Sequence, residues 1–241
     1  MLRFFSGHIS LHWFRKDLRL HDNPTLRDCL VDSAVFYGVY ILDSCAEARL
    51  SPNRWRLLLE SLKDLDASLA EYGSRLFVLE GRPLDVLPSL FEQWSITRLS
   101  FEVDCEPDCK TRDMVVTTVA KKAGIQVISH VSHTLYDTKA LLKSPEGRAP
   151  QLFDEFQKLV VQLGRPQKPV PRVDRKLFGS CVTPVGRDHD TQYGVPALDI
   201  QKLHSSGSWF YQGGEREALS RMEAALCEVG ILSDILLELF L

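Results

Sequence analysis

The chain lacks any apolar run long enough to cross a bilayer, which takes about 20 residues. Its most apolar stretch, Ile231–Leu241, is short and contains Asp234 and Glu238. The first 14 residues lack the basic region, apolar run and small-residue cleavage site of a secretory signal. These absences predict a soluble, intracellular protein with no membrane attachment.

The sequence also lacks an excess of basic charge. It has 29 Lys and Arg against 32 Asp and Glu, for a formal net charge of -3. This balance argues against nucleic-acid binding through a globally basic surface, although a local basic patch is still compatible with it. At 44% hydrophobic and 25% charged residues, the composition is that of an ordinary globular protein. A chain of 241 residues suffices for one domain of ordinary size plus a substantial remainder.

The cysteines lack the spacing of a disulfide framework. Six are present: Cys29, Cys45, Cys105, Cys109, Cys181 and Cys227. In a chain of this size without a secretory signal, free thiols are the better interpretation. A zinc site can be drawn from Cys105 and Cys109 with His130 and His133, but this spacing matches no familiar metal pattern. We therefore predict no metal site from the sequence.

What the chain does contain is a regular alternation of short apolar runs and longer helical patterns as far as residue 137. The apolar runs are rich in β-branched, aromatic and leucine residues, as in strands buried on both faces. They are Ile9–Phe14, Ala34–Leu42, Arg75–Leu79, Arg98–Glu102 and Gln126–Val131. Strict alternation with helices implies parallel strands joined by right-handed crossovers. The predicted fold class is α/β, with a doubly wound five-stranded parallel sheet of the Rossmann-like kind.

Four helices are predicted between these strands. Asn23-Pro24 reads as an N-cap followed by proline at the first helical position, and begins a helix through Leu30. The others begin near Ser51-Pro52 and cover Leu84–Trp94 and Asp108–Ala123. The helix after Ser51-Pro52 carries an apolar stripe with steps of three and four. Its members are Trp55, Leu58, Leu62, Leu65, Leu69 and Tyr72.

The loop after the first strand is the segment richest in chemistry. It has no glycine pair, which excludes a pyrophosphate cradle there. The residues alone favour a salt-bridged loop that fixes the first helix. Because the loop emerges at the carboxyl edge of the sheet, it is also a candidate ligand or interdomain edge. The candidate residues are Trp13, Arg15, Lys16, Asp17, Arg19, Asp22 and Asn23. We expect the three cations to be well exposed, so that neutralising Arg15 barely changes stability.

Trp13 to Asn23 resembles the N-terminal signature of the photolyase/cryptochrome family. The resemblance continues in order along the chain and looks most like the animal cryptochrome and (6-4) photolyase branch. Its further segments are Asn53–Arg56, Ser74–Val78, Phe101–Pro107, Ser132–Asp137, Asp188–Pro196, Gly213–Glu215 and Glu217–Leu219.

The resemblance implies a division of the chain into four parts. Residues 7–137 would form the family's α/β domain, which we expect to fold on its own, and residues 138–208 an interdomain connector. Residues 209–226 would begin the helical flavin-binding domain. Residues 227–241 do not resemble the family's continuation, so we expect a truncated form that arises by splicing, a frame shift or a gene-model error. FAD would then belong to the full-length parent, and the chain as written would bind no stoichiometric flavin.

Glu106 matches by position a carboxylate that contacts a folate antenna in some bacterial photolyases. A carboxylate can accept paired hydrogen bonds from a pterin amide and amino group. The alternative, which we favour, is that Glu106 and Asp108 place negative charge at a helix N-terminus. A folate or deazaflavin antenna is therefore an open alternative that these residues do not favour.

The resemblance implies a cryptochrome-like blue-light photoreceptor and circadian signalling protein of the nucleus and cytoplasm. Its α/β surface would bind protein partners of a light or clock pathway. The alternative is a (6-4) photolyase, which repairs damaged DNA by electron transfer from flavin; a fragment of it would be inactive as written. A generic nucleotide-binding domain lacks support because no phosphate loop is present.

Overall fold

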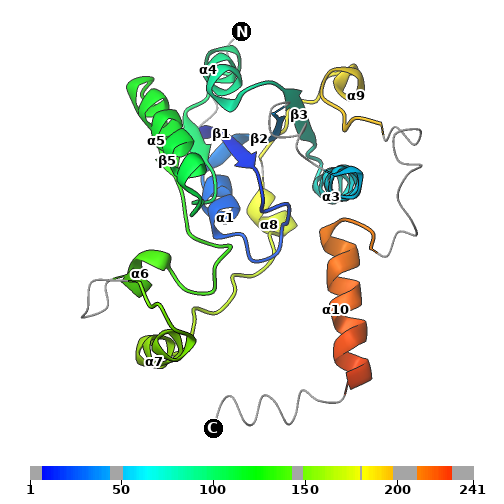
Figure 1. The fold of residues 1–241 in the computed structure, drawn as a ribbon. Coiled ribbons are helices and arrows are strands. Elements are labelled where there is room, and N and C mark those ends of the chain that lie inside the picture. The colour runs from blue at the N-terminus through cyan, green and yellow to red at the C-terminus, as the bar shows by residue number, and fades with distance from the viewer. Residues whose placement is uncertain (1–6, 44–50, 143–148, 180, 198–210, 230–241) are drawn as a thin grey trace.

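The computed structural model describes residues 7–43, 51–142, 149–179, 181–197 and 211–229. Its centre is a parallel five-stranded sheet in the order β3-β2-β1-β4-β5 (Figure 1). The strands are β1 His8–Phe14, β2 Ser33–Leu42, β3 Leu76–Glu80, β4 Arg98–Ser100 and β5 Gln126–Ile128. The predicted α/β fold with a doubly wound parallel sheet is confirmed.

The four helices that connect these strands each begin at a proline, whose fixed φ and missing N–H suit the first helical position. They are α1 Pro24–Leu30, α3 Pro52–Ala70, α4 Pro83–Gln93 and α5 Pro107–Lys122. The predicted N-cap is present, because the Asn23 side chain accepts a hydrogen bond from the Leu26 N–H at 2.9 Å. Gly73 and Gly124, both at positive φ, follow the ends of α3 and α5.

Two layers of apolar side chains enclose the sheet. Residues alternate along β1, so that Leu11 and Trp13 face α4 and α5, whereas Phe14 faces α1 and α3. The first layer adds Leu87 and Leu90 of α4 and Val116 of α5. The second layer adds residues of α1 and α3, among them Leu26, Leu59, Leu62, Leu65 and Leu69. Figure 1 shows α4 and α5 on one side of the sheet and α1 and α3 on the other.

The chain continues through short elements after β5. They are α6 Thr138–Leu142, α7 Phe153–Leu163, α8 Arg175–Phe178 and α9 His189–Gln192, followed by α10 Glu215–Val229. Helix α10 begins within residues 209–226, which the resemblance assigns to the start of the helical domain. Among the described residues, no helix combines the length and apolarity that crossing a bilayer requires.

Part of the predicted connector packs into the second layer. Phe178 is 5% exposed and contacts Phe36 of β2 edge-on, with ring centroids 5.7 Å apart. Val182 exchanges backbone hydrogen bonds of 3.0 Å with Ala34 and Phe36. A chain cut at residue 137 loses these contacts, so the packing does not favour independent folding of residues 7–137. The domain boundary itself stays a prediction.

The strands β4 and β5 are shorter than predicted, but the chain segments after them continue side by side. Phe101 N–H bonds the Ile128 carbonyl at 3.2 Å, and Val103 N–H bonds the His130 carbonyl at 2.8 Å. The segment after β4 therefore lies beside the segment after β5 beyond the edge of the regular sheet.

Candidate functional site

The order of the strands creates a switch point between β1 and β4. The chain winds from β1 outward to β2 and β3, then returns to β4 on the other side of β1 and winds outward to β5. The loops after β1 and β4 therefore leave the sheet toward opposite faces. In open α/β sheets the crevice between such loops, at the carboxyl ends of the strands, is the usual ligand site.

A cavity of about 520 Å³ opens at this edge. Its apolar lining includes buried Trp13 and Phe14 at the end of β1 and the more exposed Leu57 of α3. Four cations also line it, and two carboxylates: Arg15, Lys16, Arg54 and Arg112, with Asp43 and Asp104. The cavity therefore combines an apolar surface with mostly positive polar groups. Such a site suits a flat or aliphatic group that carries negative charge beside it.

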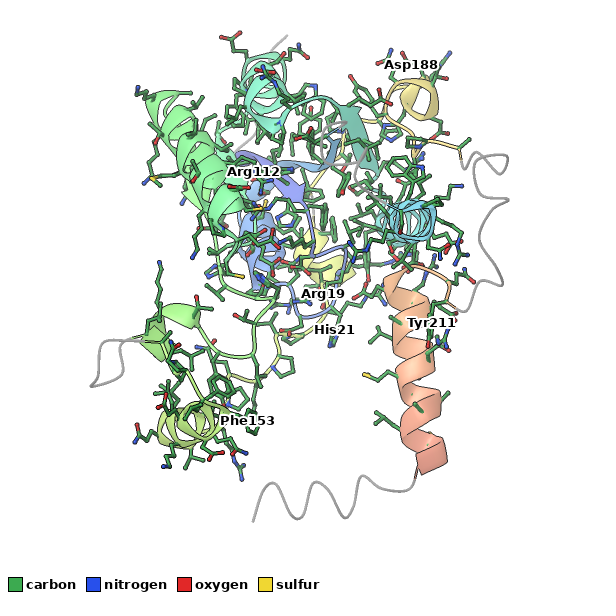
Figure 2. The ribbon with its side chains drawn as sticks, viewed as in Figure 1. Arg19, His21, Arg112, Phe153, Asp188 and Tyr211 are labelled. Carbon is green, nitrogen blue, oxygen red and sulfur yellow. The ribbon has the colours of Figure 1, made fainter. Side chains whose placement is uncertain are left out.

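The Arg15 side chain is largely covered, and the expectation that it is well exposed was wrong. Its side chain is 9% exposed, and Nη1 lies 2.6 Å from Asp113 Oδ1 of α5. The guanidinium also lies over the rings of Trp13 and Phe101, at 4.9 and 5.1 Å from their centroids. Arg112 pairs with the same Asp113 oxygen at 3.2 Å and contacts the Trp13 ring as well. Arg15 thus ties the first loop to α5. Figure 2 labels Arg112 on that helix.

Lys16 is an exposed cation of the site, with 47% of its side chain accessible. Its Nζ lies 3.0 Å from Asp104 Oδ2 and 2.7 Å from Glu106 Oε1. Although burial alone would raise the pKa of Asp104, the Glu106 backbone N–H and the Lys16 ammonium lower it to about 2. Asp104, which was not among the predicted site residues, therefore holds Lys16 beside the cavity.

Glu106 lies at the N-cap of α5 and its side chain is 62% exposed. Its carboxylate pairs with Lys16 and is not among the groups that line the 520 Å³ cavity. This placement agrees with the helix N-terminal interpretation. A contact between Glu106 and an antenna stays a prediction without support from the cavity.

Three further predicted loop residues line a second cavity, of about 540 Å³, between the loop, α3 and α10. Asp17, Arg19 and Asp22 contribute to it, together with Glu215 of α10. Glu215 accepts hydrogen bonds from the backbone N–H groups of Leu20 and His21, at 3.0 and 2.7 Å. Arg19 and His21, labelled in Figure 2, mark this loop.

The predicted edge is therefore divided between two cavities. Trp13, Arg15 and Lys16 line the first cavity. Lys16 also lines the second cavity, together with Asp17, Arg19 and Asp22. Asn23 lines neither, because it is fully buried and caps α1. Sequence reasoning missed Arg54 and Leu57 of α3 as cavity residues. It also missed the ion pair between Arg15 and Asp113.

Two buried titratable groups lie next to this edge and have displaced pKa values. Burial, with the nearby Arg15 charge, lowers the pKa of His12 to about 3. Its Nδ1 lies 2.8 Å from the Ser100 hydroxyl. Burial, with the Glu102 carboxylate, raises the pKa of Asp17 to about 7, although Arg19 Nε lies 2.9 Å from Asp17 Oδ1. At neutral pH, His12 is therefore uncharged and Asp17 is partly protonated.

These shifts predict opposite contributions to stability on acidification. In the unfolded chain His12 gains a proton below pH 6.5, whereas in the folded protein it stays neutral to about pH 3. The folded state therefore loses stability relative to the unfolded chain as pH falls from 6.5 to about 3. Folded Asp17 keeps its proton up to about pH 7, against 3.8 when unfolded, so its contribution is lost as pH rises from 3.8 through 7. Relative to His12→Gln, the wild type should lose up to about 1.4 kcal/mol per pH unit below pH 6.5.

The matched variant is Asp17→Asn, relative to which the wild type should gain stability as pH falls from 7 to 3.8. Urea denaturation of the three proteins from pH 4 to 8 measures both differences. Changes of the same sign for the two variants would contradict the assignment of these pKa shifts.

The fold and the cavity at its switch point define an α/β domain of the kind that binds a ligand or partner at the carboxyl edge of its sheet. A family model of DNA photolyase matches residues 10–174. The chain belongs to the photolyase/cryptochrome family and carries its N-terminal α/β domain.

Among individual proteins, the chain is similar to animal cryptochromes. The chain is 43% identical over 221 residues to Cryptochrome-1 of Mus musculus and 44% identical to Cryptochrome-1 of Gallus gallus. Each comparison covers 90% of this chain and 36% of the relative, so the chain spans about a third of the length of these proteins. In fold it is similar to a bacterial class III photolyase from Agrobacterium tumefaciens, with a TM-score of 0.71 and 21% identity. That match covers 92% of this chain and 45% of the photolyase.

FAD binding is typical of this family, and a solved archaeal photolyase from Sulfolobus tokodaii contains two FAD molecules. The loop between β1 and α1 has no glycine that would let backbone N–H groups approach a pyrophosphate. The described residues of this loop therefore do not fit the dinucleotide part of FAD, and we assign it no role in flavin binding.

Proposed function

We propose that the chain is a cryptochrome-like signalling protein whose α/β domain binds a partner protein at the 520 Å³ cavity. The observation that carries the proposal is the cavity itself, which combines buried Trp13 with four cationic side chains at the switch point. An apolar partner side chain would enter the cavity, and an adjacent carboxylate would meet the cations. The animal cryptochromes at 43 and 44% identity support this reading. Its protein partners would belong to a light or clock pathway, in the nucleus and cytoplasm.

Apolar residues at the mouth of the cavity favour a protein partner. Leu57 is 42% exposed, and it lines both cavities from the surface of α3. Exposed apolar residues beside charged ones are typical of sites that protein side chains occupy. The alternative occupant of the same cavity is an antenna chromophore, although Glu106 does not line the cavity.

A charge at the mouth of the cavity should abolish partner binding. The 241-residue chain serves as bait in nuclear extract, with the α/β domain of mouse Cryptochrome-1 as competitor. The competitor should displace the proteins that the wild type retains. Leu57→Asp should retain at least about tenfold less of them, because burying a carboxylate in place of an apolar side chain is costly and the new charge repels the partner's own carboxylate.

Met114→Asp is the control, because Met114 is 66% exposed on α5 and does not line either cavity. It should retain the wild-type set of proteins. An unchanged set with Leu57→Asp would refute docking at the cavity. Light-dependent repair of (6-4) lesions by this protein would instead favour the photolyase alternative.

A further inference from the structure

A cluster of metal-binding side chains lies where the segments after β4 and β5 run side by side. The hydrogen bond from Val103 N–H to the His130 carbonyl aligns the two segments. It brings Asp104 and Cys105, which follow β4, next to His133, which follows β5. The cluster lies outside both cavity linings except for Asp104.

Three different donor types converge there. Cys105 Sγ lies 3.6 Å from His133 Nε2. A carboxylate oxygen of Asp104 lies within 4.8 Å of the Cys105 sulfur and of a ring nitrogen of His133. Thiolate, imidazole and carboxylate together are ligands of zinc, and their separations suit one ion that contacts all three at about 2.0–2.3 Å.

We propose that Cys105, His133 and Asp104 bind one Zn²⁺ ion. Cys105 is exposed, so the fourth position of a tetrahedral site is open to water. Binding replaces the thiol proton of Cys105, which is released to solvent.

The surroundings of His133 support a metal on its Nε2. Its Nδ1 is buried and has no hydrogen bond among the described residues, but it lies 3.5 Å from Glu102 Oε1. A metal on Nε2 places the imidazole proton on Nδ1, where it faces this carboxylate. Glu102 is 5% exposed and is held by the Ser132 hydroxyl at 2.6 Å. A carboxylate behind a metal-binding histidine is the common arrangement in zinc sites.

The same geometry separates the proposed ligands from their neighbours. His130, which the sequence pattern groups with the cysteines, lies 2.7 Å from Asp28 instead. Cys109 belongs to a second possible group with Asp104 and Glu106. Lys16 pairs with both carboxylates of that group but with only one ligand of the proposed site, Asp104, so its positive charge disfavours a cation more strongly in the second group. The Cys105 and His133 side is therefore the favoured one.

The test uses the 241-residue chain under a thiol reductant that does not bind metals. Zn²⁺ affinity is measured by competition with a chromogenic chelator, and Co²⁺ serves as a spectroscopic probe of thiolate ligation. The wild type should bind one ion and show a thiolate-to-cobalt charge-transfer band. Cys105→Ser should lose that band, His133→Asn should weaken Zn²⁺ binding by at least about 100-fold, and Glu102→Gln should weaken it by about 10–100-fold.

Two matched variants lie outside the site: Cys227→Ser, at another exposed cysteine, and His130→Asn. Both should bind as the wild type does, and circular dichroism checks the fold of every variant. A wild type that binds no Zn²⁺ at micromolar concentration would overturn the proposal. So would a charge-transfer band that persists in Cys105→Ser and disappears in Cys109→Ser.

Discussion

The free energy of unfolding is expected to fall by about 2–5 kcal/mol when Leu62 is replaced with alanine. Leu62 is fully buried and packs in the layer between α3 and the sheet. Removal of its side chain leaves a cavity that neighbours such as Leu59 and Leu65, themselves well buried, fill only in part. Urea denaturation followed by circular dichroism measures the change.

Leu57→Ala on the same helix is the matched control. Leu57 is 42% exposed, so the same chemical change should alter stability by no more than about 0.5 kcal/mol. A loss below that value for Leu62→Ala would show that Leu62 does not face the core and that the register of α3 is wrong.

Helix α3 shows how far periodicity predicts a buried face. The stripe with steps of three and four correctly includes Leu62, Leu65 and Leu69. It misses Leu59, which is fully buried, and includes Trp55, which is only partly buried. Periodicity finds the side of a helix that is apolar, but the centre of the buried face depends on which strands and helices press against it.

The burial of connector residues in the core could not be predicted from the sequence, for a related reason. The side chains of Val173 and Phe178 are buried in the second layer. Helix α8 has only four residues, too few to produce a period. A lone apolar residue in a polar segment carries no signal of the core that it enters.

The chemistry of the candidate site depends on partners that are distant in sequence. The charged residues of the first loop predicted an edge of the sheet, but the partner of Arg15 lies 98 positions along the chain. Cys105 and His133, 28 positions apart, meet because β4 and β5 are neighbours in the sheet. Alternation of strands and helices predicts parallel pairing, yet it does not fix the order of the strands, and that order sets which loops meet.

Asp113→Ala is expected to lower the free energy of unfolding by about 3–5 kcal/mol, because it leaves buried positive charge without its partner. Asp113 Oδ1 pairs with both Arg15 and Arg112, at 2.6 and 3.2 Å. The Arg15 guanidinium lies against two aromatic rings and its side chain is 9% exposed, so it cannot regain full hydration without moving away from them. Thermal or urea denaturation measures the loss.

A double-mutant cycle separates this effect from loss of packing. Arg15→Ala alone should destabilise less than Asp113→Ala, because Asp113 keeps Arg112. The double variant should lose less than the sum of the two single losses, since neither charge is then left without the other. The control is Asp85→Ala, which breaks an exposed pair with Arg82 and should cost no more than about 1 kcal/mol. If Asp113→Ala costs no more than this control, Arg15 is as hydrated as the loop sequence suggested, and its link to α5 does not stabilise the switch point.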